Sequence, residues 1–211
     1  MAEPPLIYVV DDDASVRDSL TLLLETAGFQ VRAYDSPLSF LAAVPSGGVG
    51  CVLTDVQMPE LNGLELQQRI GAQGIRLPVI VMTGHGDVPI AVQALKAGAT
   101  DFLEKPFDDA QLLSAVKRAI AVSQRAKDEA TAVADIAGRL ATLTPREREV
   151  LDRLVAGQPN KTIAYDLGSS PRTVEVHRAR VMEKMQARSL AELVRMTIAA
   201  EGAASGKASD H

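Results

Sequence analysis

Five short apolar runs alternate with helical patterns over the first 123 residues, and this alternation restricts the possible folds more than any other feature of the chain. Strands that alternate with helices form a parallel sheet whose two faces are both covered by helices. The sequence therefore predicts an α/β domain, a (βα)5 doubly wound parallel sheet. The expected strands are LIYVV at 6–10, QVRAY at 30–34, CVLT at 51–54, PVIVM at 78–82 and DFLE at 101–104.

Helical patterns fill the segments between these runs. After the first run, apolar residues recur every three or four positions from Val16, and Gly28 ends the pattern. The later helices are expected to start at Ser36-Pro37 and at Gly63, to run from about Val88 to Ala97, and to carry Leu112, Leu113, Val116 and Ile120.

Polar residues follow the carboxyl ends of four of the five runs. The sequence DDD begins at Asp11, Asp55 follows the third run, and Thr83 and Lys105 follow the fourth and fifth. In a doubly wound sheet these ends share one edge, so we expect the side chains to converge. Each pair of neighbouring carboxylates repels by about 3 kcal/mol at roughly 5 Å and an effective dielectric near 20. A site of this kind needs a cation.

Asp12 and Asp55 together can hold one hard divalent ion, and Mg²⁺ takes oxygen ligands while it keeps several waters. Such an ion also lets a phosphoryl group sit on a carboxylate, because phosphoryl transfer needs positioning and charge neutralisation more than covalent help. Asp55 stands alone on its turn and is the expected nucleophile. Lys105 would supply a positive charge, Thr83 a hydrogen bond and Gly84 the room for phosphate to approach.

The strings VVDDD, TDVQMPELNG, VMTGHGD and DFLEKPF occur in this order. Over residues 5–122 the chain resembles the receiver domain of two-component response regulators. The resemblance implies that Asp55 is the phosphoacceptor for a sensor histidine kinase. The resemblance also implies that the protein is not an enzyme in the ordinary sense. At most it would catalyse weak self-phosphorylation and autodephosphorylation.

The resemblance also assigns roles to the residues around Asp55. Mg²⁺ would be held by Asp12, by Asp55 and by the backbone carbonyl of Gln57, and Asp11 would assist. Thr83 and Lys105 would bind the phosphoryl oxygens, the Lys105-Pro106 bond is expected to be cis, and Thr83 and Phe102 would form the switch. From its position alone, Asp13 is expected to cap the following helix instead of binding metal.

The haloacid-dehalogenase-like phosphatases are another class of proteins that form a phosphate ester on an aspartate of their own. Their nucleophile lies in an Asp-x-Asp-x-Thr pattern, whereas Asp55 is followed by Val56 and Gln57. The second acid is missing, which argues against that class.

A polar, alanine-rich stretch at 123–139 predicts a helical linker. Beyond it, over 140–205, the sequence predicts a small all-α domain. In LTPREREVL, Thr144 and Glu147 form a capping box around Pro145. Asn160 is expected to cap a short helix, Gly168-Ser169 to form a turn, and Ser170-Pro171 to start a longer helix. A last helix at about 189–200 and a disordered tail are expected to follow.

A short helix, a tight glycine turn and a longer helix form a helix-turn-helix. The string from LTPREREVL to VMEKM closely resembles LuxR-type DNA-binding domains, the output half of the NarL/FixJ family of regulators. With Val174, His177 and Val181 turned inward, the longer helix presents its N-terminal half to the major groove. Expected base contacts come from Arg172, Glu175, Val176 and Ala179, and expected phosphate contacts from Lys161, Thr173, Arg178, Arg180 and Lys184.

The two resemblances together imply a regulator that dimerises on phosphorylation and binds DNA. The expected dimer face is the fourth helix, Val88 to Ala97, with Phe102. Within the NarL/FixJ family the sequence is most similar to the nitrogen-fixation regulators. This implies a FixL-like, oxygen-sensing histidine kinase and RNA polymerase as partners, and low-oxygen genes as targets. A phosphotransfer or protein-interaction module without DNA binding is the alternative.

Charge and composition fit this organisation. Residues 1–123 carry 8 basic and 15 acidic side chains, whereas residues 143–211 carry 11 and 9, which indicates different partners for the two parts. No apolar stretch reaches the about 18 residues of a membrane span, and the start of the chain lacks the pattern of a signal peptide. With Cys51 as the only cysteine, we expect a cytoplasmic protein without disulfides or membrane contact, and an inert core thiol.

Overall fold

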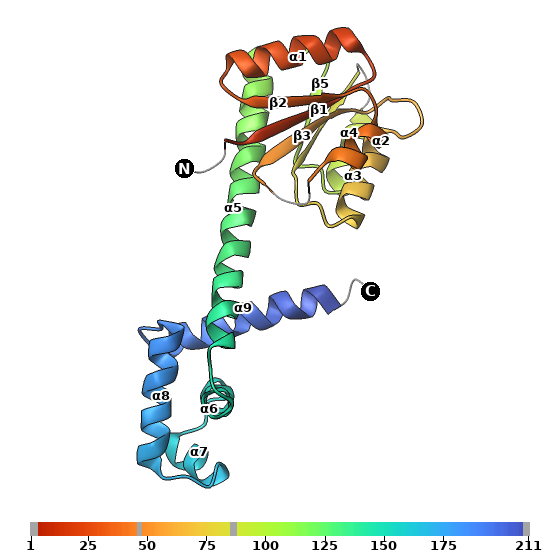
Figure 1. Cartoon of the computed structure of the whole chain (residues 1–211). Coiled ribbons are helices and arrows are strands. Elements are labelled where there is room, and N and C mark those ends of the chain that lie inside the picture. Colours follow the sequence, from red (N-terminus) through yellow and green to blue (C-terminus); the bar gives the residue numbers. More distant parts are fainter. Residues whose placement is uncertain (1–3, 46–47, 85–87, 209–211) are drawn as a thin grey trace. The chain divides into compact units, whose positions relative to one another are not determined.

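The computed structural model describes residues 4–45, 48–84 and 88–208. The chain divides into two compact units, Met1–Asp128 and Glu129–His211. Helix α5 (Asp109–Ala141) contributes residues to both units. In the described part of the first unit, parallel strands form one sheet in the order β2-β1-β3-β4-β5 (Figure 1). Their bounds are β1 (Leu6–Val10), β2 (Gln30–Tyr34), β3 (Gly50–Asp55), β4 (Val79–Thr83) and β5 (Asp101–Glu104).

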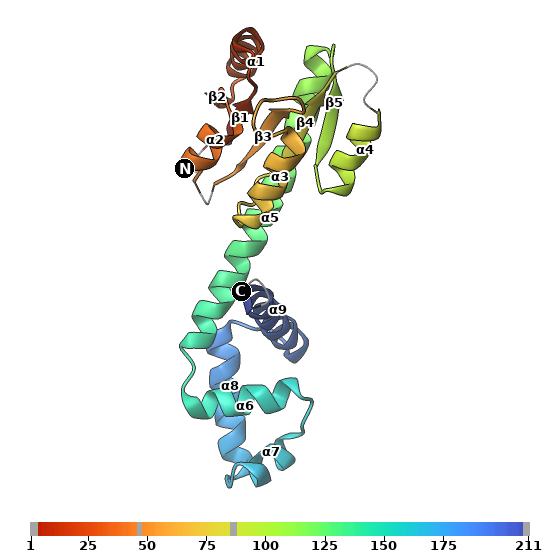
Figure 2. The same cartoon turned by 90° about the vertical axis from the view of Figure 1, so that its right-hand side faces the viewer.

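Helices cover both faces of this sheet, as predicted for a doubly wound fold. On one face, side chains of β1, β3 and β4 pack with α2 (Pro37–Ala43), α3 (Gly63–Ala72) and α4 (Val88–Lys96). On the other face, they pack with α1 (Ala14–Thr26) and the first part of α5 (Figure 2). The central strands are buried on both faces because their residues are almost all apolar, whereas β2 lies at an edge and is largely exposed.

Helix starts in this unit follow local sequence signals. The Asp13 side chain accepts hydrogen bonds from the backbone N–H groups of Ser15 and Val16, which confirms it as the N-cap of α1. Ser36 caps α2 directly before Pro37. At α3, Asn62 and Glu65 form a capping box that the sequence did not lead us to predict. These caps fix where each helix leaves the edge that carries the candidate site.

Cys51 lies in β3 with 0% of its surface exposed. Burial in this apolar core raises the pKa of its thiol to about 12. The predicted core position of the thiol is therefore confirmed, and the raised pKa disfavours thiolate, which is the reactive form.

The second unit contains α6 (Pro145–Val155), α7 (Asn160–Asp166), α8 (Pro171–Met185) and α9 (Leu190–Ala208), together with the end of α5. The predicted capping box of Thr144 and Glu147 starts α6. One buried cluster joins α6, α7 and the first half of α8 through Val150, Leu154, Ile163 and Val174. A second cluster joins α6, the second half of α8 and α9. Gly168 has a φ of 58° and forms the turn between α7 and α8.

Two local predictions in this unit are wrong. Asn160 does not cap α7: Pro159 holds the cap position with extended backbone, φ −71° and ψ 150°, so Asn160 is already helical. Of the tail predicted to be disordered, residues 201–208 continue α9, where alanine, the best helix former, recurs, and residues 209–211 lie outside the described residues.

The segment predicted as a linker, 123–139, lies entirely within α5. The division between the two units falls inside it, while the domain bounds 5–122 and 140–205 stay a prediction. None of the helices in the described part of the chain is long and apolar enough to cross a bilayer.

Candidate functional site

Two carboxylates meet at the carboxyl edge of the sheet because their strands are neighbours. Asp11 follows β1 and Asp55 ends β3, and β1 and β3 pair in parallel with Val10 opposite Thr54. Asp11 is 2% exposed, and its Oδ1 accepts a hydrogen bond of 2.9 Å from the backbone N–H of Asp13. Asp12 is exposed to solvent. The three consecutive acids therefore have three different environments.

Lys105 brings a positive charge between the buried acid and Asp55. It follows β5, where Lys105 N donates to the backbone carbonyl of Thr83 at 2.7 Å. Its Nζ lies 2.6 Å from Asp55 Oδ1 and 3.2 Å from Asp11 Oδ2. The Lys105-Pro106 bond is cis, as predicted. Of the residues predicted to converge, Asp11, Asp55 and Lys105 are thus brought together.

The pKa shifts of Asp11 and Lys105 show that the Lys105 ammonium stabilises the buried carboxylate. Burial raises the pKa of Asp11, while the hydrogen bond from Asp13 and the charge of Lys105 act in the opposite direction. Burial by itself would lower the pKa of Lys105, but its hydrogen bond and charge interaction with Asp55, and then those with Asp11, raise it overall. An ionised carboxylate in this position is costly without a nearby positive charge.

The oxygen atoms of this site are of the kind that bind Mg²⁺. Asp11, Asp12 and Asp55 offer carboxylate oxygens, and Gln57 follows Asp55 by two residues. Oxygen ligands of this kind are those that hard divalent ions take. In the described residues no three His, Cys, Asp or Glu side chains already surround a common point, and the ammonium of Lys105 lies where the two carboxylates meet. Metal binding here would shift Lys105 or share the oxygens with it.

Of the remaining predicted site residues, Gln57 contacts Asp55 directly. Gln57 N donates to Asp55 Oδ2 at 2.6 Å, which orients the carboxylate. Thr83 is 2% exposed at the end of β4, and Gly84 follows it. Phe102 on β5 is 38% exposed, so its ring lies on the outer surface. Of the VMTGHGD string, residues 85–87 lie outside the described residues.

Gly63 supports the backbone of Asp55 from α3. A Cβ added at Gly63 would lie 2.3 Å from the backbone oxygen of Asp55. We expect Gly63→Ala to destabilise the first unit by about 1–3 kcal/mol and to slow phosphate labelling, because the backbone at Asp55 must move. Urea unfolding followed by near-ultraviolet circular dichroism, which reports on the packed rings of Tyr8, Tyr34 and Phe40, measures the first effect.

Gly71→Ala is the matched control, since it lies on the same helix with nothing within 4 Å of the added Cβ. It is expected to stabilise α3 by about 0.5–1 kcal/mol. Equal stability of the two variants would contradict the close packing at Gly63.

A second candidate site lies on α8. Val174, Val181 and Met185 are buried and His177 is half-buried, so this face packs inward as predicted. Exposed side chains on the remaining surface of α8 include most of those predicted to contact DNA, namely Arg172, Thr173, Glu175, Val176, Ala179 and Arg180. Arg178 on the same helix is half-buried, and Lys161 is exposed on α7.

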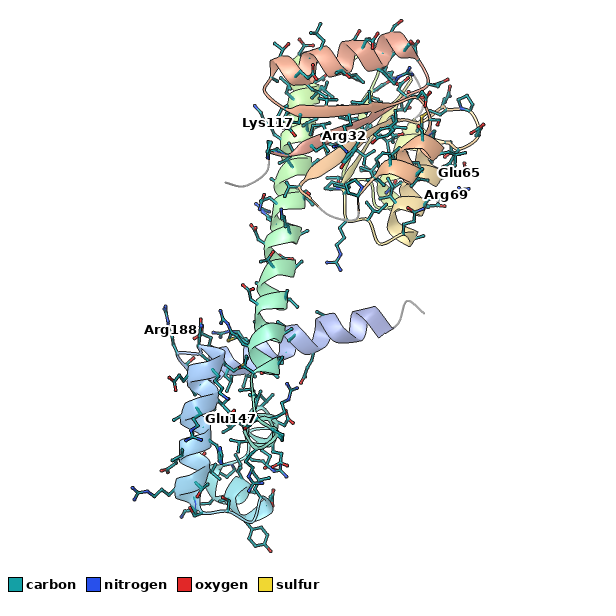
Figure 3. All side chains as sticks on the ribbon, viewed as in Figure 1. Arg32, Glu65, Arg69, Lys117, Glu147 and Arg188 are labelled. Atoms are coloured by element: carbon teal, nitrogen blue, oxygen red, sulfur yellow. The ribbon has the colours of Figure 1, made fainter. Side chains whose placement is uncertain are left out.

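One predicted phosphate contact must be corrected. Lys184 Nζ lies 2.6 Å from Glu147 Oε2 and 3.1 Å from the carbonyl of Thr142, so its charge is used inside the unit. Glu147 lies on α6 (Figure 3). It is 2% exposed and also accepts a hydrogen bond of 2.8 Å from Thr144 N. Because the pair spans 37 positions, no local pattern predicts it.

This ion pair predicts a pH dependence. The hydrogen bond from Lys184, then that from Thr144, lowers the pKa of Glu147 from 4.5 to about 2. A lowered folded-state pKa gives stability that is complete above the unfolded-state value and is lost as the pH falls toward the folded-state value. We expect the second unit to lose up to about 3 kcal/mol between pH 4.5 and pH 2.

Hydrogen exchange of α6 and α8 peptides across this pH range measures the loss. In Glu147→Gln the titrating carboxyl is gone, so the variant is less stable at neutral pH and its stability changes less with acid. A Glu147→Gln variant with the same acid profile as the wild type would assign the loss to other groups.

Sequence reasoning missed two arginines that support these sites. Arg17 Nη1 donates to the carbonyl of Asp11 at 2.8 Å and so holds the acidic turn from α1. Arg146 donates to the carbonyl of Leu167, at the end of α7, and pairs with Glu149 at 2.8 Å. Arg17 lies one helical turn after the cap Asp13, and this spacing could have indicated its contact with the acidic turn. The partner of Arg146 lies 21 positions away, so no local pattern indicates that contact.

Comparisons with known proteins agree with this arrangement. Residues 7–117 match the response regulator receiver domain, and residues 141–197 match bacterial regulatory proteins, luxR family. The transcriptional regulatory protein FixJ of Bradyrhizobium diazoefficiens is 53% identical over 92% of this chain and 95% of that protein. The solved structure of the response regulator StyR covers 92% of this chain and 98% of its own at 38% identity, with a TM-score of 0.81. Full-length FixJ from B. japonicum covers 95% and 98% at 51% identity, with a TM-score of 0.58.

Proposed function

The chain belongs to the response regulators with a receiver domain and a luxR-family output domain, and we propose that phosphate on Asp55 controls its binding to DNA. It is a phosphorylation-controlled transcription regulator of the FixJ type. The observation that carries the assignment of Asp55 is the contact of its carboxylate with the Lys105 ammonium at 2.6 Å, at the edge where Asp11 and Asp12 also lie.

In the proposed reaction a histidine kinase donates the phosphoryl group. The bond between phosphorus and the histidine nitrogen breaks as a bond forms between phosphorus and a carboxylate oxygen of Asp55. Lys105 then interacts with the phosphoryl oxygens in place of the carboxylate, and Thr83 donates a hydrogen bond to them. Mg²⁺, held by Asp12, Asp55 and the Gln57 carbonyl with help from Asp11, would supply the charge neutralisation that the transfer needs. Self-phosphorylation and autodephosphorylation are proposed to be slow.

The switch couples Thr83 to the surface formed by α4 and β5. When Thr83 turns toward the phosphate, the ring of Phe102 moves from its exposed position into the space released. To change the ratio of active to resting conformation from 1:99 to 99:1, the phosphate must stabilise the active conformation by about 5.5 kcal/mol more than the resting one. Several charge-assisted hydrogen bonds to one phosphate can supply this difference. Exposed apolar residues of these two elements include Val92 and Leu95, each 45% exposed, and Phe102, 38% exposed. They support the proposal that the surface dimerises.

A dimer would bring two copies of α8 to two half-sites on DNA. Helix-turn-helix dimers bind half-sites about one helical turn apart, so the operator is expected to be roughly palindromic. Glu175 can accept a hydrogen bond from cytosine N4 and Val176 can contact a thymine methyl group. Lys161, Arg178 and Arg180 would hold phosphates and make binding dependent on salt.

The partners follow from the same proposal. The family implies a sensor kinase, and the similarity to FixJ supports a FixL-like kinase, activation with RNA polymerase and targets among nitrogen-fixation and low-oxygen genes. A cytoplasmic location, where DNA and kinase are both accessible, is part of the proposal.

Sedimentation velocity with Mg²⁺ and beryllofluoride, which mimics an aspartyl phosphate, tests the function. The wild type is expected to dimerise and to bind DNA more tightly in a parallel gel shift, while Asp55→Asn stays unchanged in both. Dimerisation without any salt-sensitive DNA binding would instead favour a phosphotransfer or protein-interaction module. Equal behaviour of the two proteins would contradict control by Asp55.

A further inference from the structure

The C-terminal end of α8 is fixed by the helix that leaves the receiver. Arg139 Nη1, on α5, donates to the backbone carbonyl of Met185 at 3.2 Å. Met185 is the last residue of α8, and Gln186 after it takes the left-handed conformation, with φ 55° and ψ 31°. The last carbonyls of a helix have no intrahelical donor. The turn after α8 supplies donors for the carbonyls of Met182 and Glu183, and Arg139 supplies one for Met185.

Apolar contacts reinforce this bond. Ile136 and Leu140, on either side of Arg139 along α5, pack against a buried cluster that contains Val181 and Met185 of α8. A guanidinium at a helix C-terminus also interacts favourably with the helix dipole. The last two turns of α5 therefore form part of the support of α8 and do not act as a free linker.

The same helix has a firm attachment in the first unit. Its N-terminal half packs on the sheet through Leu112 and Val116, both fully buried. Ser123 Oγ, also on α5, accepts a hydrogen bond of 3.1 Å from the backbone N–H of Gly50, the first residue of β3. Asp55 is the last residue of that strand. Within the first unit, α5 therefore contacts the strand that carries the phosphoacceptor.

We propose that Arg139 is a positioning residue for DNA recognition. This inference rests on the proposed contact between α8 and the major groove. Arg139 fixes one end of α8 and so sets the angle at which Glu175 and Val176 meet the bases. Hydrogen bonds to base edges are directional and need this angle, whereas long basic side chains reach phosphates over a range of angles.

The test uses the full chain, treated with acetyl phosphate and Mg²⁺, in the wild-type, Arg139→Ala and Arg139→Lys forms. The probes are a duplex enriched from random DNA by the wild type and a scrambled duplex of the same composition, with affinity measured by fluorescence anisotropy. Arg139→Ala is expected to bind the enriched duplex about tenfold more weakly and the scrambled duplex within about twofold of wild type. Arg139→Lys, which keeps a donor and the charge, is expected to restore most of the preference.

Arg125→Ala is the matched control, because Arg125 is exposed on the same helix within the first unit. It is expected to behave as wild type. An unchanged preference in Arg139→Ala, or an equal loss on both duplexes that follows a loss of helical circular dichroism, would overturn the positioning role. If the wild-type chain enriches no duplex, the proposed DNA binding itself is contradicted. The failure of the proposed function is thus distinguishable from the failure of the proposed role of Arg139.

Discussion

Replacing Asp55 by asparagine is expected to make labelling of the intact chain by acetyl phosphate and Mg²⁺ more than about a hundredfold slower. Asparagine keeps the size of the side chain but removes the nucleophilic carboxylate. It also leaves the Lys105 ammonium, now 2.6 Å from Asp55 Oδ1, with Asp11 as its remaining carboxylate partner. Mass spectrometry of the whole protein, followed by peptide mapping, measures both the rate and the position of the label.

Asp13→Asn controls for the loss of a negative charge in the acidic turn that follows β1. Asp13 caps α1 and is exposed, and asparagine is an equally good cap, so labelling is expected to stay near the wild-type rate. The assignment of the acceptor to β3 would be wrong if Asp55→Asn were labelled as fast as Asp13→Asn and the phosphate mapped to another acid.

Lys184→Met is expected to destabilise the second unit by about 3–5 kcal/mol. The substitution keeps most of the side-chain volume but leaves the Glu147 carboxylate, 2% exposed, without its ammonium partner. The unpaired buried charge is the source of the cost, more than the loss of the bond itself. Hydrogen exchange resolved by peptide reports opening of α6 and α8 separately from the receiver.

The double variant Glu147→Gln with Lys184→Met separates these contributions. With no charge left to bury, it is expected to recover part of the stability lost in Lys184→Met, which a double-mutant cycle expresses as a coupling energy. Lys161→Met, at an exposed lysine of the same unit, is the surface control and is expected to lose little. If Lys184→Met is as stable as Lys161→Met, the ion pair does not stabilise the unit.

Much of the fold could be predicted from the sequence because the signals are local. The runs that became β1, β3 and β4 are apolar at nearly every position, which is typical of strands buried on both faces. The polar residues that follow the strands lie at one edge as a direct result of parallel pairing, so the sequence predicts that Asp55 and Lys105 lie close together, and their side chains are 2.6 Å apart.

Two other features could not be predicted, one because two adjacent residues compete for the same position and one because the partners are distant in the sequence. The cap of α7 was assigned to Asn160 because asparagine is a common cap, but the extended backbone of Pro159 moved the helix start by one residue. The sequence predicts a phosphate contact for Lys184 because it is a basic residue on the predicted recognition helix. Its partner Glu147 lies on another helix, and only the packing of α6 against α8 brings the two together.

The buried thiol in β3 has a practical consequence for spectroscopy. Since Cys51 is the sole cysteine, is fully enclosed and has a pKa near 12, a maleimide dye will not react with it in the folded protein. A cysteine introduced at an open position such as Leu22, 68% exposed, would then be the one accessible label. With two introduced cysteines, the distance between their labels can be followed by energy transfer during phosphorylation, without first removing a native residue.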